Sequence, residues 1–410
     1  MENLRTSSIV QPNALKASST ENPTVTSVKQ TVNNALKSTD DFISKKVSQE
    51  GNNPFGSRND VNPNKTPNGT LEKQFVNSIK KLDINNDGFV SRRELVDSSN
   101  SNKLDDKDSA LVGALLESQS KLENLSDDEM GLETKGITKK DIIALDELPD
   151  ASELKSNTEV LYSNNLYKIM TVKNTVQDKS GNFKLPTKAS DVDFQQIHQG
   201  SLGDCYFLAV LASFAQKNPQ KIVDMIKDNK DGTFTVKFPD KSVTIKAPNK
   251  TELGMYSSES NSAWVPIIEK GYAAYRQDKT LIKKTNEYDN IGKGSSIIGR
   301  GMYELTGNLF DTDVVKVHSL SDTKNKLVSA QNGNKMIVAS INKGLIAKNK
   351  YDLPDGHVYT VLGIDPKTDM VKIRNPWGSG EGNVKGGTNG IFELPLSEFK
   401  NTFSSVAYER

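Results

Sequence analysis

The residue best suited to covalent chemistry is Cys205, the only cysteine among 410 residues. It follows the loop Gln199–Asp204, which contains two glycines, and it begins an almost wholly apolar run that ends near Phe214. We expect this run to form a buried helix, with Asp204 as its N-cap and Cys205 in its first turn. A thiol there faces the positive end of the helix dipole, which favours the nucleophilic thiolate. A lone cysteine is more often a small buried apolar residue, so this interpretation depends on its partners.

A cysteine nucleophile needs a base, and the base needs a group that orients it. His357 begins a predicted strand, and a turn at Pro366 leads to a return strand that ends at Asn375. A hairpin centred on Pro366 pairs residues whose numbers add up to about 732, which places His357 beside Asn375. We expect the Asn375 oxygen to accept the Nδ1–H of His357, so that Nε2 faces the thiol and Trp377 covers the bond. The alternative is a hairpin with polar ends and no chemical role.

Gln199 and the two other histidines complete the set of candidate site residues. The Gln199 side chain is expected to donate to an oxyanion, together with the backbone N–H of Cys205. His198 has no evident orienting partner; we expect it to be exposed, with a secondary role in the substrate site as the lesser alternative. His318 lies in an alternating segment and is expected to play no chemical part.

A second kind of site is predicted at residues 83–94, where the spacing of oxygen-bearing residues matches a calcium-binding loop. An amphipathic helix predicted from Leu71 to Leu82 leads into this loop, and Gly88 stands where the chain must turn sharply. The alternative is an Asn/Asp-rich turn in an ordinary helical hairpin. The expected Ca2+ ligands are the side chains of Asp83, Asn85, Asp87, Ser91 (through a water) and Glu94, and the backbone carbonyl of Phe89.

Residues 130–141 align with a second such loop, but Met130, Leu132 and Thr134 occupy its first ligand positions and are poor partners for a hard cation. We expect a degenerate loop that pairs with the first one through a short bridge between Ile137 and Val90. Residues 66–150 are therefore predicted to form an all-α EF-hand pair with one competent calcium site.

Composition and charge limit the remaining possibilities. The 53 basic and 52 acidic residues give a net charge of +1, which argues against nucleic-acid partners and against a polybasic membrane patch. The sequence contains neither a secretory leader nor an apolar run long enough to cross a membrane. We therefore expect a cytoplasmic protein, with leaderless export left open and the oligomeric state unknown.

The chain divides into four predicted parts. Residues 1–65 are rich in Ser, Thr, Asn and Pro and are expected to be a disordered arm. The EF-hand pair follows at 66–150, a linker at 151–184 and the domain that contains Cys205 at 185–410. Helices precede strands in this last domain, which predicts an α+β fold with two lobes.

Five segments carry a resemblance to a known family: QGSLGDCYFLA (199–209), WVPIIEKGY (264–272), LTG (305–307), GHVY (356–359) and RNPWG (374–378). Together they resemble the catalytic core of calpains, the calcium-dependent branch of the papain-like cysteine proteases. The resemblance implies a helical lobe that carries Cys205 and an antiparallel β-lobe that carries His357 and Asn375. It also implies hydrolysis of protein substrates through a thioacyl-enzyme, with Gln199 as the oxyanion donor.

The sequence departs from the family at several points. Tyr206 follows the cysteine where many members have Trp, and the predicted calcium loop precedes the core. The main prediction is a calcium-regulated cysteine endopeptidase. Two alternatives remain: a transglutaminase-type acyltransferase, and a calcium-binding protein whose protease core is inactive.

Overall fold

The computed structural model describes residues 68–101, 103–126, 136–257, 261–277, 290–292, 294, 297–342 and 349–410. The predicted disordered arm, and the part of the predicted second loop at 130–135, lie outside the described residues. All described residues belong to one compact unit, Gln49–Arg410. Within this part of the chain, no helix combines the length and apolar character that crossing a membrane requires.

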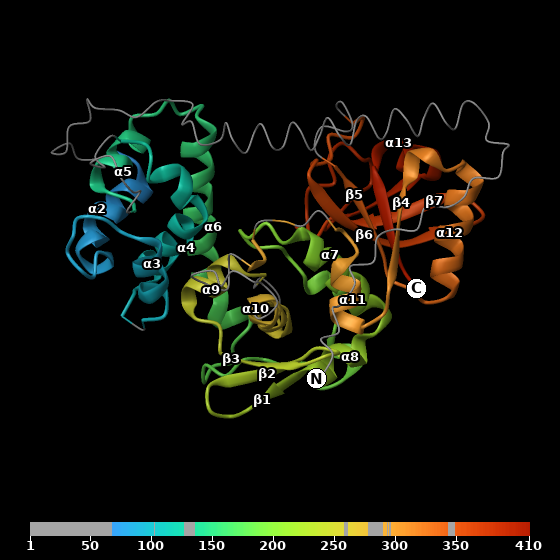
Figure 1. Ribbon diagram of the computed structural model, residues 1–410, viewed down its shortest axis with the longest axis horizontal. Helices are drawn as coiled ribbons and strands as arrows, with labels where there is room; N and C mark the ends of the chain where they lie inside the picture. Colours follow the sequence, from blue (N-terminus) through green and yellow to red (C-terminus); the bar gives the residue numbers. More distant parts are fainter. Residues whose placement is uncertain are drawn as a thin grey trace, which may run out of the picture. The chain divides into compact units, whose positions relative to one another are not determined.

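The first described elements are four helices of a helical module (Figure 1): α2 (Thr70–Leu82), α3 (Arg92–Ser99), α4 (Asp106–Leu122) and α5 (Lys139–Asp146). The predicted bridge between Val90 and Ile137 is present, with N–H···O distances of 2.9 and 3.0 Å in the two directions. Ser91 caps α3 and Thr138 caps α5 by the same reciprocal hydrogen bonds with the residue three positions later. Two similarly capped helices thus begin on either side of one bridge.

A long helix, α6 (Glu153–Thr175), occupies the segment that the sequence predicted only as a linker. It packs against α4 and α9 (Lys250–Met255). Tyr162 and Ile169 are buried, whereas Tyr167 and Met170 are more than half exposed, so apolar residues lie on both faces of the helix. A helix with apolar residues on both faces has a weak period, which explains why the sequence did not reveal it.

The helical lobe surrounds α7 (Cys205–Lys217), which is buried along most of its length. The ring of Phe207 in α7 stacks on the ring of Tyr272 at 3.7 Å. The neighbouring elements are α8 (Pro219–Met225), α10 (Trp264–Gln277), α11 (Arg300–Thr306), the short helices η1 (Ala189–Asp191) and η2 (Phe194–Gln196), and an antiparallel sheet of β1 (Ile226–Asp228), β2 (Thr233–Lys237) and β3 (Ser242–Lys246).

The second lobe is an antiparallel sheet in the order β4-β9-β5-β6-β7-β8, coloured orange to red in Figure 1. Every strand pair in the sheet is antiparallel. Its elements are β4 (Phe310–Val314), η4 (Val315–Val317), α12 (Leu320–Asn332), β5 (Ile337–Ile341), β6 (His357–Asp365), β7 (Met370–Arg374), β8 (Ile391–Pro395), α13 (Leu396–Thr402) and β9 (Ser405–Glu409).

The β6–β7 hairpin forms as predicted, but its register is two to three positions away from the predicted one: Val361 pairs with Ile373 and Asp365 with Met370. The turn is not centred on Pro366, because Asp365 accepts the backbone N–H of Asp369 at 2.9 Å and closes a longer loop. A bulge between Val361 and Gly363 shifts the register further.

Helix α7 packs directly on the inner strands of the β-lobe. Thr360 in β6 donates to the Ala209 carbonyl at 2.7 Å, and the backbone N–H of Ile337 in β5 donates to Ser213 Oγ at 3.2 Å. One apolar core extends from the helical module through the helical lobe, and a second core fills the β-lobe. The N-terminus of α7 is therefore fixed against the start of β6.

Candidate active site

Cys205 begins α7, as the sequence predicted, but its thiol is held in a different electrostatic state. The residue is 8% exposed, and the backbone N–H of Val358 in β6 lies against the sulfur. Burial raises the pKa of Cys205 to about 11, which is opposite to the expected stabilisation of the thiolate. The free energy needed to remove a thiolate from water exceeds the stabilisation that the positive end of the helix dipole provides.

Asp204 occupies the N-cap position, but its side chain does not cap the helix. The Asp204 carbonyl accepts the backbone N–H groups of Phe207 and Leu208, whereas the carboxyl group is turned inward and fully buried. The prediction of a side-chain cap at Asp204 is therefore wrong.

His357 and Asn375 form a hydrogen bond, with 2.8 Å between His357 Nε2 and Asn375 Oδ1. The Asn375 amide has a fixed orientation, because its Nδ2 donates to the Gly380 carbonyl and its Oδ1 also accepts the backbone N–H of Trp377. The ring must therefore donate through Nε2, and Nδ1 is the nitrogen left to act as a base. The sequence had predicted the reverse assignment of the two ring nitrogens.

His357 is 5% exposed, and burial lowers its pKa to about 4, against an opposing effect of the Asn375 bond. The Trp377 ring lies 4.6 Å from the His357 ring and is itself 41% exposed, so it covers the histidine from the solvent side. Among the described residues, no hydrogen bond joins the Cys205 sulfur to the His357 ring. Burial thus favours the neutral form of both the thiol and the imidazole.

Gln199 lies where the loop before Cys205 meets the segment after β7. Its backbone N–H donates to the Pro376 carbonyl at 2.9 Å, and its side-chain Nε2 donates to the Leu202 carbonyl at 2.7 Å. The side-chain oxygen is buried and has no hydrogen-bond partner among the described residues. The Gln199 amide is thus held within the loop, and one of its two N–H groups is engaged.

Two buried charged residues support this region and were quoted from the sequence without a role. Arg374, at the end of β7, donates to the Ile197 carbonyl and, at 3.4 Å, to the Gln195 carbonyl. Its burial lowers the pKa of the guanidinium to about 10. Glu269, in α10, accepts the backbone N–H of Ser257 at 3.0 Å. Their signal in the sequence was their position within two of the segments that resemble the calpain core, 264–272 and 374–378.

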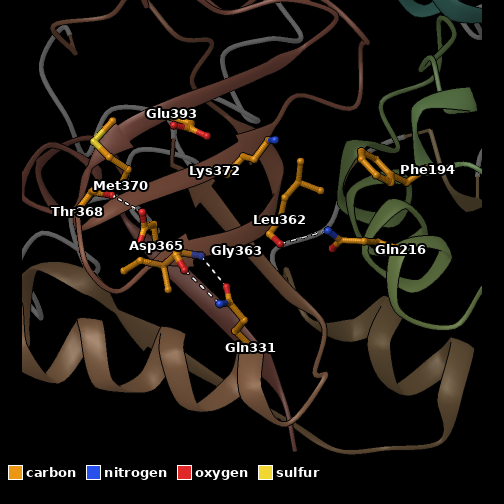
Figure 2. Close-up of a pocket in the computed structure, with 11 residues that line it drawn as sticks. Phe194, Gln216, Gln331, Leu362, Gly363, Asp365, Thr368, Met370, Lys372 and Glu393 are labelled. Carbon is orange, nitrogen blue, oxygen red and sulfur yellow. Dashed lines mark hydrogen bonds between the residues drawn. The ribbon is translucent and has the colours of Figure 1, made fainter.

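A cavity of about 450 Å³ lies beside the β6–β7 hairpin and does not include the candidate catalytic residues (Figure 2). Gln216 and Gln331 project from α7 and α12 and donate to the carbonyls of Leu362 and Ile364. Their amides are therefore used to support the bulged part of β6.

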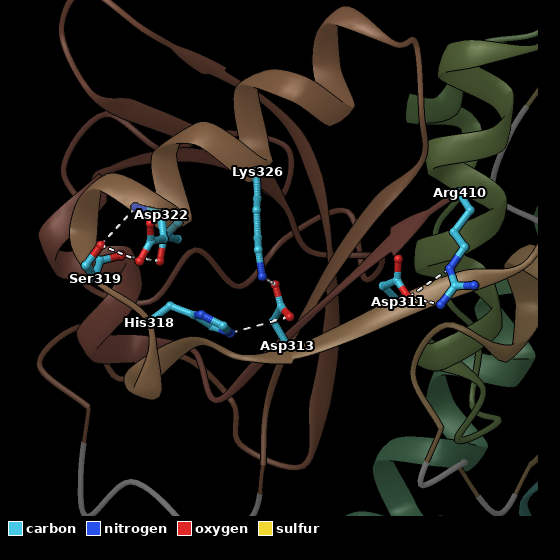
Figure 3. A network of polar contacts seen from close by, with 8 residues as sticks. Asp311, Asp313, His318, Ser319, Asp322, Lys326 and Arg410 are labelled. Atoms are coloured by element: carbon cyan, nitrogen blue, oxygen red, sulfur yellow. Dashed lines mark hydrogen bonds and ion pairs between the residues drawn. The ribbon is translucent and has the colours of Figure 1, made fainter. Parts of the chain in front are cut away.

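The remaining histidines differ from each other. His198 is half-buried, because its ring lies against Gly378, where a Cβ would come within 2.3 Å of His198 Nδ1. His318 belongs to the surface network in Figure 3, in which Asp313 contacts His318 at 3.4 Å and Lys326 at 2.6 Å. We had predicted that His198 is exposed, but the structure shows it half-buried. The side-chain contacts of His318 are those of a surface ion-pair network.

The predicted calcium loop has its oxygen atoms turned towards the backbone. Glu94 Oε1 accepts the N–H groups of Ile84 and Asn85 at 2.9 and 3.2 Å, and Oε2 accepts that of Ser91 at 2.9 Å. Asp83 accepts the N–H groups of Asp87 and Gly88. Among the described residues, no three His, Cys, Asp or Glu side chains gather as a metal site. The donor types nevertheless fit a hard cation, because every candidate ligand atom is an oxygen.

Comparison with known proteins identifies the family to which this region belongs. The family model described as "Calpain family cysteine protease" matches residues 162–388, more than half of the chain. The chain therefore belongs to the calpain family of cysteine proteases. The match begins within α6, which lies in the segment predicted as a linker.

Individual relatives are distant and longer than the matched region. Human calpain-9 is 26% identical over 211 residues, which is 46% of this chain and 29% of calpain-9. Mouse calpain-5 is 24% identical over 224 residues, 46% of this chain and 35% of the relative. Bovine calpain-1 catalytic subunit is 25% identical over 208 residues, 45% of this chain and 27% of the relative. The matched region thus spans about a third of these relatives or less.

Proposed function

We propose that the protein is a calcium-regulated cysteine endopeptidase with Cys205 as nucleophile, His357 as base and Asn375 as the group that orients the base. One observation carries the proposal. The N–H of Val358 contacts the Cys205 sulfur, and the preceding residue, His357, is bonded to Asn375 through Nε2. This hydrogen-bonding pattern supports Nδ1 as the nitrogen that would serve the thiol.

The proposed reaction begins with both groups neutral. The Cys205 sulfur attacks the carbonyl carbon of the scissile peptide bond while its proton passes to His357 Nδ1. The imidazolium then protonates the leaving amine, and a thioester links the acyl part of the substrate to Cys205. Water attacks the thioester and gives one proton to Nδ1, and the imidazolium returns this proton to the departing sulfur to restore the thiol. The released acid then loses its remaining proton to solvent and leaves as a carboxylate. Asn375 holds the ring in one orientation throughout.

Gln199 and the backbone N–H of Cys205 are the proposed oxyanion donors. Gln199 Nε2 has two hydrogens, and the Leu202 carbonyl accepts one of them. The second is available for the oxygen that becomes negative in the tetrahedral intermediate. The bond between the Gln199 backbone and the Pro376 carbonyl keeps this donor close to the loop that holds Asn375 and Trp377.

The proposed calcium site is the loop 83–94, an EF-hand loop whose ligands would be the six residues predicted from the sequence. A bound cation would neutralise the loop carboxylates and replace the backbone N–H groups that they now accept. The module contacts the catalytic lobe through α4, since Asp106 pairs with Lys250 of α9 at 2.7 Å. The end of α9 holds the loop before Cys205, because the Met255 carbonyl accepts the Ser201 N–H at 2.9 Å. We infer that loop occupancy acts on Gln199 and Cys205 by this route.

Casein digestion tests the proposed activity. We expect the wild-type protein to release new peptide N-termini from casein in the presence of Ca2+, and Cys205→Ser to release none. Transfer of the acyl group to added amines without release of new N-termini would favour an acyltransferase. If wild-type and Cys205→Ser proteins are equally inert, the core is an inactive one.

The calcium part is tested separately with Glu94→Gln. We expect this variant to lose calcium-stimulated digestion and to keep its fold, because the amide oxygen still accepts a backbone N–H. Glu153→Gln, an exposed change at the start of α6, serves as the matched control and should behave as wild type. Unaltered stimulation in Glu94→Gln would refute regulation through this loop.

A further inference from the structure

Two carboxyl groups lie buried behind Cys205, outside the proposed triad. Asp204 precedes the nucleophile and Glu269 projects from α10, and both residues are 0% exposed. In the described part of the chain, neither oxygen of the Asp204 side chain, nor Oε1 of Glu269, meets an N–H or O–H donor. Two isolated buried carboxylates would cost several kcal/mol each, so their charge must be reduced by another route.

The two carboxyl groups reduce this cost by contacting each other. They lie within hydrogen-bonding reach, and such a bond requires that one of them carries a proton. Burial, the largest cause, raises the pKa of Asp204 to about 7; burial and the Asp204 charge together raise that of Glu269 well above its ordinary value. Two like charges so close to each other cannot both ionise near neutral pH.

Other charged and titratable groups face the pair from two helices. The ammonium group of Lys168, in α6, acts on both carboxyl groups and favours one negative charge. The Cys205 thiol and the Tyr206 phenol, both in α7, have their pKa values raised by the charge of Asp204, in addition to the larger effect of burial. The balance that these groups favour is one shared proton and one negative charge.

The pair also connects the nucleophile to the proposed oxyanion donor. Glu269 Oε2 accepts the N–H of Ser257 at 3.0 Å, and Ser257 Oγ accepts the N–H of His198 at 2.8 Å. His198 directly precedes Gln199 in the chain. A continuous line of contacts therefore runs from Asp204, next to Cys205, through α10 to the backbone of Gln199.

We propose that Asp204 and Glu269 share one proton and act as positioning residues, which hold Cys205 and Gln199 in place and keep a single negative charge behind the sulfur. The inference rests on the proposed function, since it assigns a role relative to the nucleophile and the oxyanion donor. When the shared proton is lost at high pH, a second charge forms behind Cys205, and the thiol becomes harder to ionise.

The shared proton can be measured directly by infrared difference spectroscopy at pH 7. We expect the C=O band of a protonated carboxyl group to be lost in Asp204→Asn and in Glu269→Gln, because an amide replaces the proton donor in each. Glu252→Gln is the matched control: Glu252 is 3% exposed but forms a salt bridge with Lys270 at 2.8 Å, so this change should remove no such band. Unchanged carboxyl bands in both pair variants would overturn the proposal.

The position of the charge is tested by the pH dependence of iodoacetamide alkylation of Cys205, the sole thiol. Asp204→Asn moves the remaining charge away from the sulfur, whereas Glu269→Gln fixes it on Asp204. We expect the thiol of Asp204→Asn to have the lower pKa and to react about tenfold faster at pH 7 than that of Glu269→Gln. Identical profiles in the two folded variants would refute the proposed role.

Neither measurement requires proteolysis. If casein is not cleaved but the carboxyl band and the alkylation profiles behave as described, the proposed function fails and the shared proton stands. In the opposite outcome, casein is cleaved but neither measurement differs between the variants. The proposed protease function then stands, and the proposed role of Asp204 and Glu269 is refuted.

Discussion

The cysteine side and the histidine side of the candidate active site differ in the charge of the residues that surround them. Behind Cys205 lie two buried carboxyl groups, Asp204 and Glu269, whereas His357 is supported by the neutral side chains of Asn375 and Trp377. Burial drives both reactive groups towards neutrality, raising the pKa of the thiol and lowering that of the imidazole. On the histidine side, neutral partners need only fix the orientation of the ring. On the cysteine side, a residual negative charge opposes the thiolate.

Under the proposed mechanism, this contrast means that the sulfur loses its proton to His357 during attack and not before it. A stable thiolate beside Asp204 would place negative charges next to each other in a site that is almost closed to water. Transfer to His357 Nδ1 leaves the sulfur beside a new positive charge and removes this penalty. The orientation of His357 should therefore matter more than any other single contact.

The largest expected effect comes from the neutral side of the site. Asn375→Ala removes the acceptor for His357 Nε2–H, so the ring is free to rotate and to change tautomer. We expect kcat/KM for a peptide substrate to fall about 1000-fold, within the range usual for loss of a positioned acid–base group. Asn383→Ala, a change of an exposed asparagine, is the control and should have little effect. A loss of less than tenfold in Asn375→Ala would mean that the orientation of His357 is not decisive.

The next effect concerns Gln199, the proposed oxyanion donor on the cysteine side. Gln199→Ala should lower kcat about 100-fold with little change in KM, because the donor acts on charge that appears only in the transition state. Gln195→Ala provides a matched control, since the Gln195 side chain is exposed and the hydrogen bonds of Gln195 to Asp193 and Arg374 use its backbone. An increase in KM with unchanged kcat would assign Gln199 to substrate binding instead.

A smaller effect is expected on stability. In the folded protein His357 has a pKa of about 4, against an ordinary value of 6.5. Between pH 4 and 6.5 the imidazole is therefore protonated in the unfolded chain but neutral in the folded one. Protonation of the unfolded chain lowers the free energy of unfolding, so this free energy is highest above pH 6.5. It decreases by about 3 kcal/mol as the pH falls through 4. Urea unfolding across this range should show a difference between wild type and His357→Gln that shrinks with falling pH. A pH-independent difference would contradict the lowered pKa.

The smallest expected effect concerns Trp377, whose ring covers the His357 ring on the solvent side. Trp377→Ala opens one face of the His357 ring to water, which favours the charged form and raises the pKa of His357 towards its ordinary value. Proton NMR titration of the imidazole signals can follow this change, because the chain has only three histidines. Leu309→Ala, which changes another exposed apolar residue, should leave the titration of His357 unaltered. An unshifted His357 titration in Trp377→Ala would mean that other groups bury the ring.

The sequence identified residues that lie together in space, but it misjudged their electrostatics. Glycine, aspartate and a long apolar run were enough to predict the helix that begins at Cys205, and a turn between two alternating strands was enough to bring His357 near Asn375. The direction of the Cys205 pKa shift was wrong, because burial by β6 depends on how the two lobes pack. The predicted donor nitrogen of His357 was also wrong, because the orientation of the Asn375 amide depends on its contact with Gly380.

Residues whose role depends on distant contacts were the hardest to predict. Glu269 and Arg374 each stand near another charged residue in the sequence, and only the folded chain brings Glu269 to the Ser257 N–H and Arg374 to the Ile197 carbonyl. Helix α6 was missed because apolar residues on both of its faces obscure its period. The bridge between Val90 and Ile137 was predicted correctly, since a repeated loop pattern fixes which residues face each other. The calcium site itself stays a prediction.

The central claim is that His357 accepts the proton of Cys205, and the rate of alkylation of Cys205 by iodoacetamide at pH 6 tests it most directly. Wild-type and His357→Ala proteins would be compared under the same conditions, with the modified residue verified by mass spectrometry. The account predicts that loss of His357 slows alkylation by at least about tenfold, because the buried thiol then has no base. Equal rates in the two proteins would contradict it.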